Sequence, residues 1–260
     1  MKKRLTRFLP FLLAFTIALP SYSVFAEEEN QAKETQTNET NETQADETTA
    51  NDTLSLAAET AVLIDAASGE ILYDKDADKK MYPASITKLM TILLALENGK
   101  LTDEITFSHD AVYNIEPGSA HIAILEGETL TLEQVLRAII LRSANEASNG
   151  VAEYVDGSVE AFAKHMTERA KELGCTNTNF VNANGLFDEN HYTTAHDMAL
   201  IARELLKHEE YRSMMSETDY EIPPTNLQTE TRYLHGQHQM LNPNSIYYYK
   251  DAIGGKTGYT

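Results

Sequence analysis

The amino-acid sequence predicts an α+β domain. Two short β-prone runs come first, at residues 60–66 (TAVLIDA) and 70–73 (EILY), and several helical patterns follow them. Further strand-like runs, residues 246–250 and 252–258, lie near the end of the chain. The order of strands, helices and then strands favours one sheet that is closed by the two ends of the chain.

The first elements read as a hairpin and then a buried helix. A short A-S-G linker joins the two β-prone runs. Residues 83–99 (PASITKLMTILLALENG) carry apolar side chains on nearly every face, which is typical of a helix buried on all sides. Lys88 lies one turn into this helix, and burial of an ammonium group is unfavourable unless the group is paired or neutralised. Lys88 therefore needs a chemical explanation.

Three later segments have the patterns of ordinary helices. Residues 131–141 carry apolar side chains at helical spacing behind Thr131, a residue type that caps helices well. Residues 158–173 and 194–207 predict two further helices. The lone Cys175 cannot form an internal disulfide, so we expect it to be a small buried hydrophobe.

The first 53 residues predict export and a tether. Residues 1–26 combine a cationic start, an apolar run and small residues before position 27, which is the pattern of a secretory signal peptide. Residues 27–53 are acidic and contain no aromatic and no branched aliphatic residue, so they predict a disordered tether. We therefore expect an exported, extracytoplasmic protein whose globular part spans residues 54–260.

Charge and spacing argue against two kinds of partner. A formal net charge of −19 disfavours binding to the phosphate backbone of nucleic acid. His235 and His238 suggest a metal site, but no third ligand is evident beside them. We expect solvated loop histidines there and no metal.

Ser85 gives Lys88 a chemical purpose. The two residues are three positions apart, so on a helix their side chains share one face. A desolvated lysine loses its proton more easily, and neutral Lys88 can then accept the proton of Ser85 and activate it as a nucleophile. The S-x-x-K pattern is equally typical of an N-cap serine followed by a surface lysine, so this pattern alone leaves both interpretations open.

Two more patterns complete a known set. S-A-N occupies residues 143–145 and K-T-G occupies residues 256–258, which gives the order S-x-x-K, S-x-N, K-T-G. On these motifs and on residues 180–202, the chain from about residue 54 onward resembles the penicillin-binding, serine-type D-alanyl-D-alanine carboxypeptidases of low molecular mass. The resemblance implies a β-lactamase/transpeptidase-like fold, with an antiparallel sheet that has helices on both faces.

The same resemblance implies catalytic roles. Ser85 would attack the carbonyl between the two D-alanines of a peptidoglycan stem peptide and form an acyl-enzyme, with Lys88 as its base. Ser143 would relay a proton between Lys88 and the leaving amine. Asn145 would donate to the amide of the substrate and to Lys88.

Substrate binding and the oxyanion hole are implied in the same way. Lys256 and Thr257 would bind the terminal carboxylate, and Gly258 would let the strand approach the substrate. The oxyanion hole would consist of the backbone N–H groups of Ser85 and Tyr259. Such sites need no metal or cofactor, and β-lactam antibiotics would act as covalent inhibitors.

The chain departs from the family pattern at two places. Ala144 stands where glycine is common, and the sequence stops at Thr260, two residues after K-T-G. Family members continue with two strands and a helix, then usually a β-rich domain and an amphipathic membrane-associating helix. We therefore expect the catalytic domain to be incomplete after the K-T-G strand, and the isolated chain to fold poorly or to be weakly active.

Three alternatives stay open from the sequence. A class A β-lactamase shares the three motifs, although residues 180–202 contain no E-x-x-L-N. A catalytically silent wall-binding module would keep the cleft without the reaction. In the third alternative, Ser143 and Asn145 have no catalytic role and simply cap the helix that begins near Glu146.

Export is directly testable. The cationic start and the small residues before position 27 predict cleavage after Ala26. Mass spectrometry of secreted protein is expected to find Glu27 at or near the new N-terminus. An intact Met1 in the exported pool would contradict the prediction.

Overall fold

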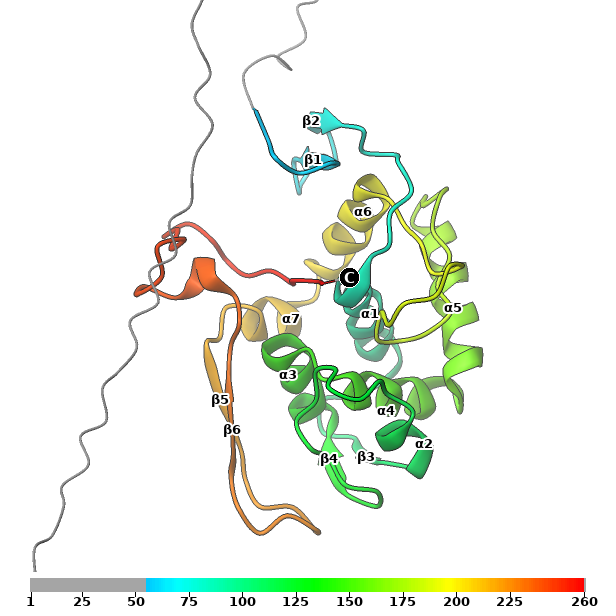
Figure 1. Ribbon diagram of the computed structural model, residues 1–260, viewed down its shortest axis with the longest axis vertical. Coiled ribbons are helices and arrows are strands. Elements are labelled where there is room, and N and C mark those ends of the chain that lie inside the picture. Colours follow the sequence, from blue (N-terminus) through cyan, green and yellow to red (C-terminus); the bar gives the residue numbers. More distant parts are fainter. Residues whose placement is uncertain (1–54, 260) are drawn as a thin grey trace, which may run out of the picture. The chain divides into compact units, whose positions relative to one another are not determined.

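The described residues surround one central helix. The structure is a computed structural model that describes residues 55–259 (Figure 1). All of these residues fall in the unit Thr48–Thr260. The predicted signal peptide and tether, residues 1–26 and 27–53, lie outside the described residues.

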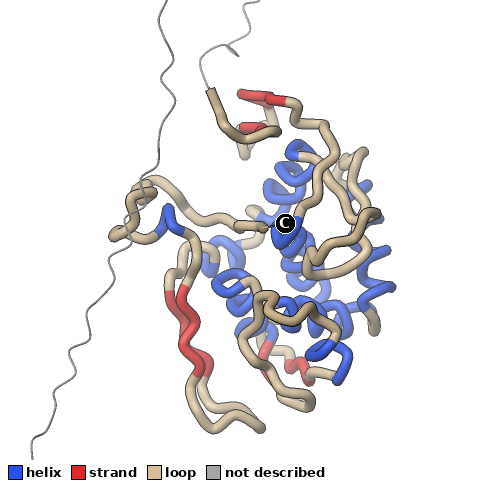
Figure 2. The backbone as a smooth tube through the Cα atoms, viewed as in Figure 1, coloured by secondary structure: helices blue, strands red, loops and turns tan. Residues whose placement is uncertain are grey.

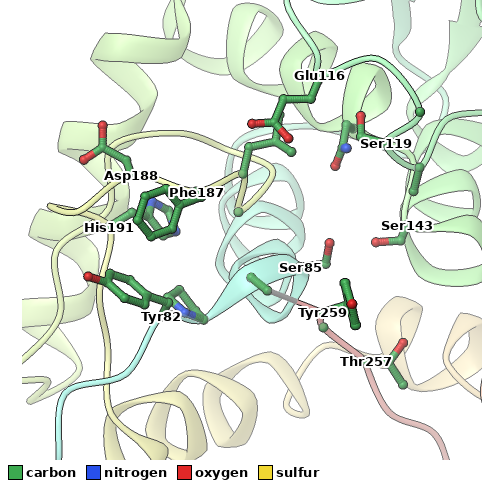
Figure 3. A pocket seen from close by; sticks show the side chains of 18 of the residues that line it. Tyr82, Ser85, Glu116, Ser119, Ser143, Phe187, Asp188, His191, Thr257 and Tyr259 are labelled. Atoms are coloured by element: carbon green, nitrogen blue, oxygen red, sulfur yellow. The ribbon is translucent and has the colours of Figure 1, made fainter.

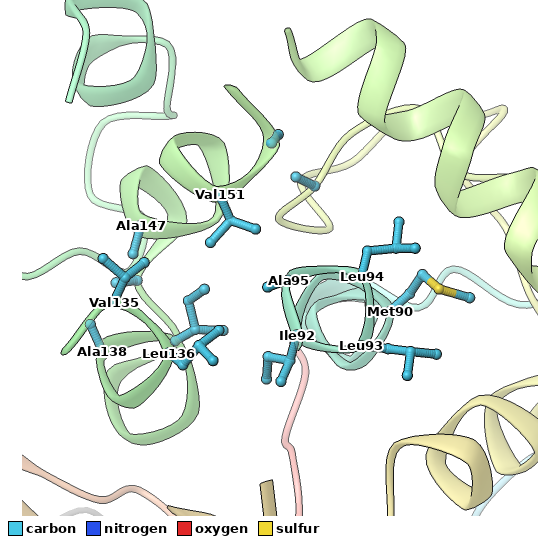
Figure 4. Packing of buried hydrophobic residues seen from close by; sticks show 14 of the residues in the cluster. Met90, Ile92, Leu93, Leu94, Ala95, Val135, Leu136, Ala138, Ala147 and Val151 are labelled. Carbon is cyan, nitrogen blue, oxygen red and sulfur yellow. The ribbon is translucent and has the colours of Figure 1, made fainter. Parts of the chain in front are cut away.

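Helix α1 (Lys88–Asn98) lies at the centre and is buried on all sides, as predicted. Met90, Leu93 and Leu94 have no exposed surface, and Figure 4 shows their side chains around the helix axis. The helix contacts α3, α4, α5 and α6. Burial of a leucine or methionine side chain stabilises a fold by about 1.5–3 kcal/mol. The packing of this helix therefore holds the residues at its N-terminal end in place.

The other helices begin where the sequence predicts. Thr131, Ser158 and Thr194 each cap a helix by accepting a hydrogen bond from a backbone N–H three residues later, which confirms the three predicted helices. None of the helices within residues 55–259 is both long and apolar enough to cross a membrane. Their bounds are α2 (His109–Tyr113), α3 (Leu132–Arg142), α4 (Asn145–Asp156), α5 (Val159–Glu172), α6 (Ala195–Leu205) and α7 (Glu209–Met214).

The predicted hairpin is present near the start of the described residues. Strand β1 (Ala61–Ile64) pairs antiparallel with β2 (Ile71–Lys75). The Asp65 carboxylate stabilises the turn, because it accepts hydrogen bonds from the N–H and the hydroxyl of Ser68.

The single sheet predicted from the sequence is not observed in residues 55–259. The strands form three separate antiparallel pairs, β1 with β2, β3 (Glu104–Thr106) with β4 (Thr129–Thr131), and β5 (Asp219–Ile222) with β6 (Arg232–His235) (Figure 2). The α+β class holds, but the helices pack mainly on one another rather than on two faces of one sheet.

The two C-terminal strand predictions are wrong: the first segment forms turns, and the second has no neighbouring strand. The N–H groups of Tyr248 and Ala252 donate to carbonyls three residues earlier, so residues 246–250 form turns. Residues 252–259 run without helix or strand. A strand needs a neighbour to accept its ladder hydrogen bonds, and none of the described strands lies beside this segment.

A buried ion pair connects the β3–β4 pair with the β5–β6 pair. The Arg232 guanidinium on β6 donates two hydrogen bonds, at 2.6 and 2.7 Å, to the two oxygens of the fully buried Glu128 carboxylate. A bidentate pair fixes both position and direction. It therefore anchors the start of β6, the strand after which the chain continues toward the cleft.

Cys175 is a small buried residue, as predicted. Its thiol donates to the carbonyl oxygen of Asp197 at 3.4 Å. Burial raises the pKa of the Cys175 thiol to about 12, so the thiolate that a catalytic cysteine requires is strongly disfavoured.

Candidate active site

The first turn of the central helix brings Ser85 and Lys88 together. Residues Ala84–Thr87 form a 3-10 helix, η2, rather than the α-helical turn predicted from the sequence. Side chains three residues apart eclipse one another in a 3-10 helix. The Ser85 Oγ consequently lies 3.0 Å from the Lys88 Nζ.

Lys88 is fully buried and contacts three oxygen atoms. Besides Ser85, its Nζ lies 2.7 Å from Asn145 Oδ1 and 2.5 Å from the carbonyl oxygen of Asn184. Both of these oxygens can only accept, so they take two N–H bonds. A neutral amine then has its lone pair left for the Ser85 hydroxyl, which is the arrangement that a general base needs.

The electrostatics of the site favour that neutral form. Burial holds the pKa of Lys88 well below its usual value, and the charge of Lys256 lowers it further, while the Glu146 carboxylate opposes these effects. The nearest ligands of the amine are uncharged, so none of them stabilises an ammonium group as a carboxylate would.

Residues 143–145 lie at the junction of α3 and α4. Ser143 adopts a left-handed conformation with φ of 57° and ends α3 as its C-cap; α4 begins two residues later, at Asn145. The N-cap of α4 is Ala144, without a side-chain hydrogen bond. The alternative in which Ser143 and Asn145 merely cap this helix is therefore wrong.

Ser143 and Asn145 contact the reacting groups differently from expectation. The Ser143 Oγ is buried and has no hydrogen-bond partner within the described residues. Figure 3 shows the hydroxyls of Ser85 and Ser143 pointing toward one another. Asn145 was expected to donate to Lys88, but its Oδ1 accepts from the amine, because an ammonium or amine presents N–H groups.

All three motifs contribute to one open cleft of about 690 Å³. Among its walls are Ser85, Ser143, Asn145, Thr257 and Tyr259, with Gly258 between the last two. Residues that are far apart in the sequence thus line one cleft.

Lys256 is the exception among the predicted site residues. Its Nζ donates to the carbonyl oxygen of Thr257 at 2.6 Å, and its side chain does not line the cleft. Partial burial lowers the pKa of Lys256 to about 8. Since its charge lowers the pKa of Lys88, Lys256 acts on the site electrostatically.

Two glycines press against the backbone of the nucleophile. A Cβ on Gly258 would lie 3.0 Å from the Pro83 carbonyl oxygen and 3.3 Å from the Ser85 nitrogen. A Cβ on Gly185 would lie only 1.9 Å from the Ala84 carbonyl oxygen. Ala84 itself has a φ of 47°, a strained value for alanine. The peptide before Ser85 is therefore held between two close backbone approaches.

The loop at Asn184 and Gly185 was missed as part of the site. The loop contacts Lys88 through a backbone carbonyl oxygen, and such a contact cannot be predicted from the type of residue. The Asn184 side chain fixes the loop, because its Nδ2 donates to Asn149 Oδ1 and its Oδ1 accepts from the Leu186 N–H. The Asn-Gly dipeptide signals a turn but not its position against Ser85.

His191 was also missed, and it supports η2 from the side. Its Nδ1 accepts a hydrogen bond from the Val181 N–H, so its proton lies on Nε2 and is donated to Thr87 Oγ1 at 2.7 Å. Burial lowers the pKa of His191 to about 4. A neutral imidazole therefore connects the loop to the turn that carries Ser85.

The histidines considered as metal ligands have other contacts. The His235 Nδ1 lies 2.6 Å from the Asp219 Oδ1 on the paired strand. The His238 ring packs against Gly255, where a Cβ would meet its Nε2 at 2.2 Å. The His235 ring therefore contacts the paired strand of the β5–β6 hairpin, and the His238 ring packs against the segment before Lys256.

Comparison with known proteins identifies the family. Residues 44–260 match the Peptidase_S11 family, described as D-alanyl-D-alanine carboxypeptidase. The chain belongs to this family. It is 38% identical over 213 residues to the D-alanyl-D-alanine carboxypeptidase DacF of Bacillus subtilis, covering 80% of this chain and 52% of the relative. With DacA of Haemophilus influenzae it shares 31% identity, over 79% of this chain and 51% of the relative. The chain thus spans about half the length of these curated relatives.

Solved structures of Peptidase_S11-like enzymes confirm the predicted fold. The Streptomyces K15 DD-transpeptidase matches with a TM-score of 0.73 at 25% identity, covering 80% of this chain and 82% of that one. A D-alanyl-D-alanine carboxypeptidase from Mycobacterium tuberculosis matches with a TM-score of 0.70 at 27% identity, covering 78% and 73% of the two chains. The arrangement is therefore transpeptidase-like, although the strands within residues 55–259 form three separate pairs.

The close approach of Gly185 gives a first test within this S11 site. Gly185→Ala is expected to displace the turn that carries Ser85, because both the 1.9 Å contact and a φ of 86° oppose a Cβ. Misplacement of a reacting group by 1 Å can lower a rate about 100-fold, so labelling by fluorescent penicillin is expected to fall by about that factor.

Gly157→Ala is the matched control for that substitution. Gly157 has a similar φ of 77° but nothing within 4 Å of its Cβ position. It should lose only about 1–2 kcal/mol of stability in thermal unfolding and keep its labelling rate. Equal labelling by the two variants would show that the approach of Gly185 is unimportant.

The shared electrostatics of Lys88 and Lys256 give a second test. The rate of acylation by penicillin is expected to fall about tenfold per pH unit below the pKa of Lys88, because the protonated amine cannot accept a proton. Lys256→Met removes a positive charge that lowers this pKa. The acid limb of the pH–rate profile should therefore move toward higher pH.

Lys250→Met provides the control for the loss of a charge, since Lys250 is exposed on the same C-terminal segment. Its acid limb should stay at the wild-type position. The midpoint is compared rather than the amplitude, because the amplitude also depends on how well penicillin binds. An unmoved midpoint in Lys256→Met would contradict the coupling.

Proposed function

We propose that this chain is the catalytic domain of a serine-type D-Ala-D-Ala carboxypeptidase, which removes the terminal D-alanine from peptidoglycan stem peptides. The observation that carries the proposal is the 3.0 Å contact between Ser85 Oγ and the buried Lys88 Nζ beside an open cleft. Membership of the Peptidase_S11 family supports the substrate class. The predicted signal peptide supports action outside the cytoplasm.

Acylation begins with proton transfer to the base. Neutral Lys88 accepts the hydroxyl proton of Ser85, and the Oγ attacks the carbonyl carbon between the two D-alanines. Negative charge develops on the carbonyl oxygen, which the backbone N–H groups of Ser85 and Tyr259 stabilise. The close passage of Gly258 along the backbone at Ser85 supports this pairing of N–H groups.

The leaving amine then takes a proton through Ser143. Lys88 returns the proton by way of the Ser143 hydroxyl to the nitrogen of the terminal D-alanine, the C–N bond breaks, and the acyl group stays on Ser85. Water attacks the ester carbonyl and gives a proton to Lys88. Lys88 returns this proton to the Ser85 Oγ as the ester C–O bond breaks and the shortened peptide leaves. The buried and unpartnered Ser143 Oγ supports a role that is filled only when substrate is bound.

Binding of the terminal carboxylate is assigned to the K-T-G segment. Thr257 lines the cleft and offers a hydroxyl for direct contact. Lys256 adds a nearby positive charge from behind the same segment. A β-lactam, which also presents a carboxylate beside a reactive carbonyl, would occupy the same positions and acylate Ser85.

Acyl transfer to an amine is a second candidate. The K15 DD-transpeptidase matches this chain over a larger share of its own length than the carboxypeptidases do. The chemistry differs only in whether water or an amine attacks the acyl-enzyme. A class A β-lactamase is disfavoured, because the group of residues 180–202 that contacts Lys88 is a carbonyl oxygen rather than a glutamate carboxylate.

Release of D-alanine tests the proposal. The purified chain is incubated with a peptide that ends in D-Ala-D-Ala, with and without added glycine as an amine acceptor. Ser85→Ala and Lys88→Ala are each expected to lower release by a factor of 10³ or more, because nucleophile and base act as one unit. Mass spectrometry distinguishes the hydrolysed peptide from the transfer product.

Ser213→Ala is the control, since Ser213 is an exposed serine on α7. It should release D-alanine at the wild-type rate. Fast turnover of penicillin without release of D-alanine would identify a β-lactamase. Binding of the peptide without any product would identify a silent wall-binding module.

A further inference from the structure

A second asparagine of α4 contacts the loop that supplies a carbonyl to Lys88. Asn145 and Asn149 are four positions apart on this helix, so their side chains share one face. Asn145 contacts the Lys88 amine directly, at 2.7 Å. Asn149 Oδ1 accepts a 3.0 Å hydrogen bond from the Nδ2 of Asn184, whose backbone oxygen is the other neutral acceptor for Lys88. One face of α4 therefore contacts both acceptors, the first as its own side chain and the second through the loop.

The contacts of Asn149 with α2 fix the orientation of its amide group. Asn149 is only 2% exposed, and its Nδ2 lies 3.3 Å from the carbonyl oxygen of Ala111 in α2 and 3.5 Å from that of Asn114 at the C-cap. Carbonyl oxygens only accept hydrogen bonds, so the NH₂ group of Asn149 must face α2. The amide oxygen must then face Asn184. Asn149 therefore presents a fixed acceptor to the loop.

Other side chains hold the backbone of the same loop. Asn182 Oδ1 accepts hydrogen bonds from the N–H groups of Asn184 and Gly185, at 3.3 and 2.7 Å. Thr91 on α1 donates from its Oγ1 to the carbonyl oxygen of the residue before Asn184, at 2.6 Å. Loss of the Asn149 contact is therefore expected to shift the Asn184 carbonyl without detaching the loop from α1.

We propose that Asn149 is a positioning residue for the general base. A neutral lysine amine has two N–H bonds and one lone pair, so two fixed acceptors determine where the lone pair points. By holding the side chain of Asn184, Asn149 keeps the second acceptor in place, and the lone pair of Lys88 points toward Ser85. This inference rests on the proposed function, in which Lys88 accepts the proton of Ser85.

A role of Asn149 confined to α2 makes a different prediction. The last carbonyls of a helix have no partner within the helix, and Asn149 could stabilise the fold simply by donating to them. The effect of losing Asn149 would then be the same whether or not residue 184 carries its amide. The positioning role requires that amide, because the hydrogen bond from Asn149 ends there. A double-mutant cycle therefore separates the two roles.

Acylation by fluorescent penicillin tests the proposal. Measurements over a range of penicillin concentrations give the acylation rate constant at saturation and, separately, the concentration for half-saturation. Asn149→Ala is expected to lower the rate constant about two- to tenfold, the range that one neutral hydrogen bond contributes. The half-saturating concentration should not change, because Asn149 does not line the cleft at Ser85. In an Asn184→Ala background, Asn149→Ala should cause no further decrease.

Asn179→Ala is the matched control. The Asn179 amide also donates to a carbonyl oxygen of residues 180–202, but the bond of 2.7 Å ends at Asn190. This variant should keep the wild-type rate constant. Thermal unfolding of each variant establishes that it is folded. If Asn149→Ala does not fold, Asn149→Ser replaces it, because a hydroxyl can still donate to a carbonyl of α2 but is too short to reach Asn184.

The outcomes separate this inference from the proposed function. If the wild-type chain is not acylated and releases no D-alanine, the proposed function fails and the inference fails with it. If the wild-type chain is acylated and Asn149→Ala has the same rate constant, the function stands and the positioning role is rejected. An equal decrease with and without the Asn184 amide, or a similar decrease in Asn179→Ala, also rejects it.

Discussion

The burial of one amine governs the rest of this site. Lys88 has no exposed surface, and its Nζ is held by oxygens from Ser85, Asn145 and Asn184. These residues come from η2, from the start of α4 and from a loop whose Asn184 lies 96 residues after Lys88, so the site exists only when all three segments are in place. Because charged lysine is strongly disfavoured in such surroundings, the fold itself prepares the base for proton transfer.

Two further backbone segments pack closely against the backbone at Ser85. Gly185 lies against the Ala84 carbonyl on one side, and Gly258 lies against Pro83 and Ser85 on the other. The left-handed Ala84 is unfavourable by about 1–3 kcal/mol. The buried helix α1, which follows directly, supplies the packing that offsets this strain. Rigidity of the nucleophile is thus a consequence of the same helix that buries its base.

Local features of this fold could be read from the sequence, whereas long-range contacts could not. Periodic apolar residues and cap residues such as Thr131 predicted the helices. The family resemblance implied which side chains of the three motifs lie in one site, although Lys256 does not line the cleft. The carbonyl of Asn184 and the tautomer of His191 depend on tertiary contacts that leave no mark in residue type. The segment from Ala252 to Gly258 has strand composition, yet composition alone does not supply the neighbour that a strand requires.

The absence of charge on the oxygens that contact Lys88 favours its neutral form. A carboxylate in place of the Asn145 amide, 2.7 Å from the Nζ, would form an ion pair and hold the proton on the amine. The amide oxygen accepts one hydrogen bond and adds no charge. Glu146, one position later, does favour the charged amine, but burial and the positive charge of Lys256 oppose it. The site therefore holds the amine with two neutral oxygens, from Asn145 and Asn184, and leaves its lone pair for Ser85. This is the condition for a lysine to act as a base near neutral pH.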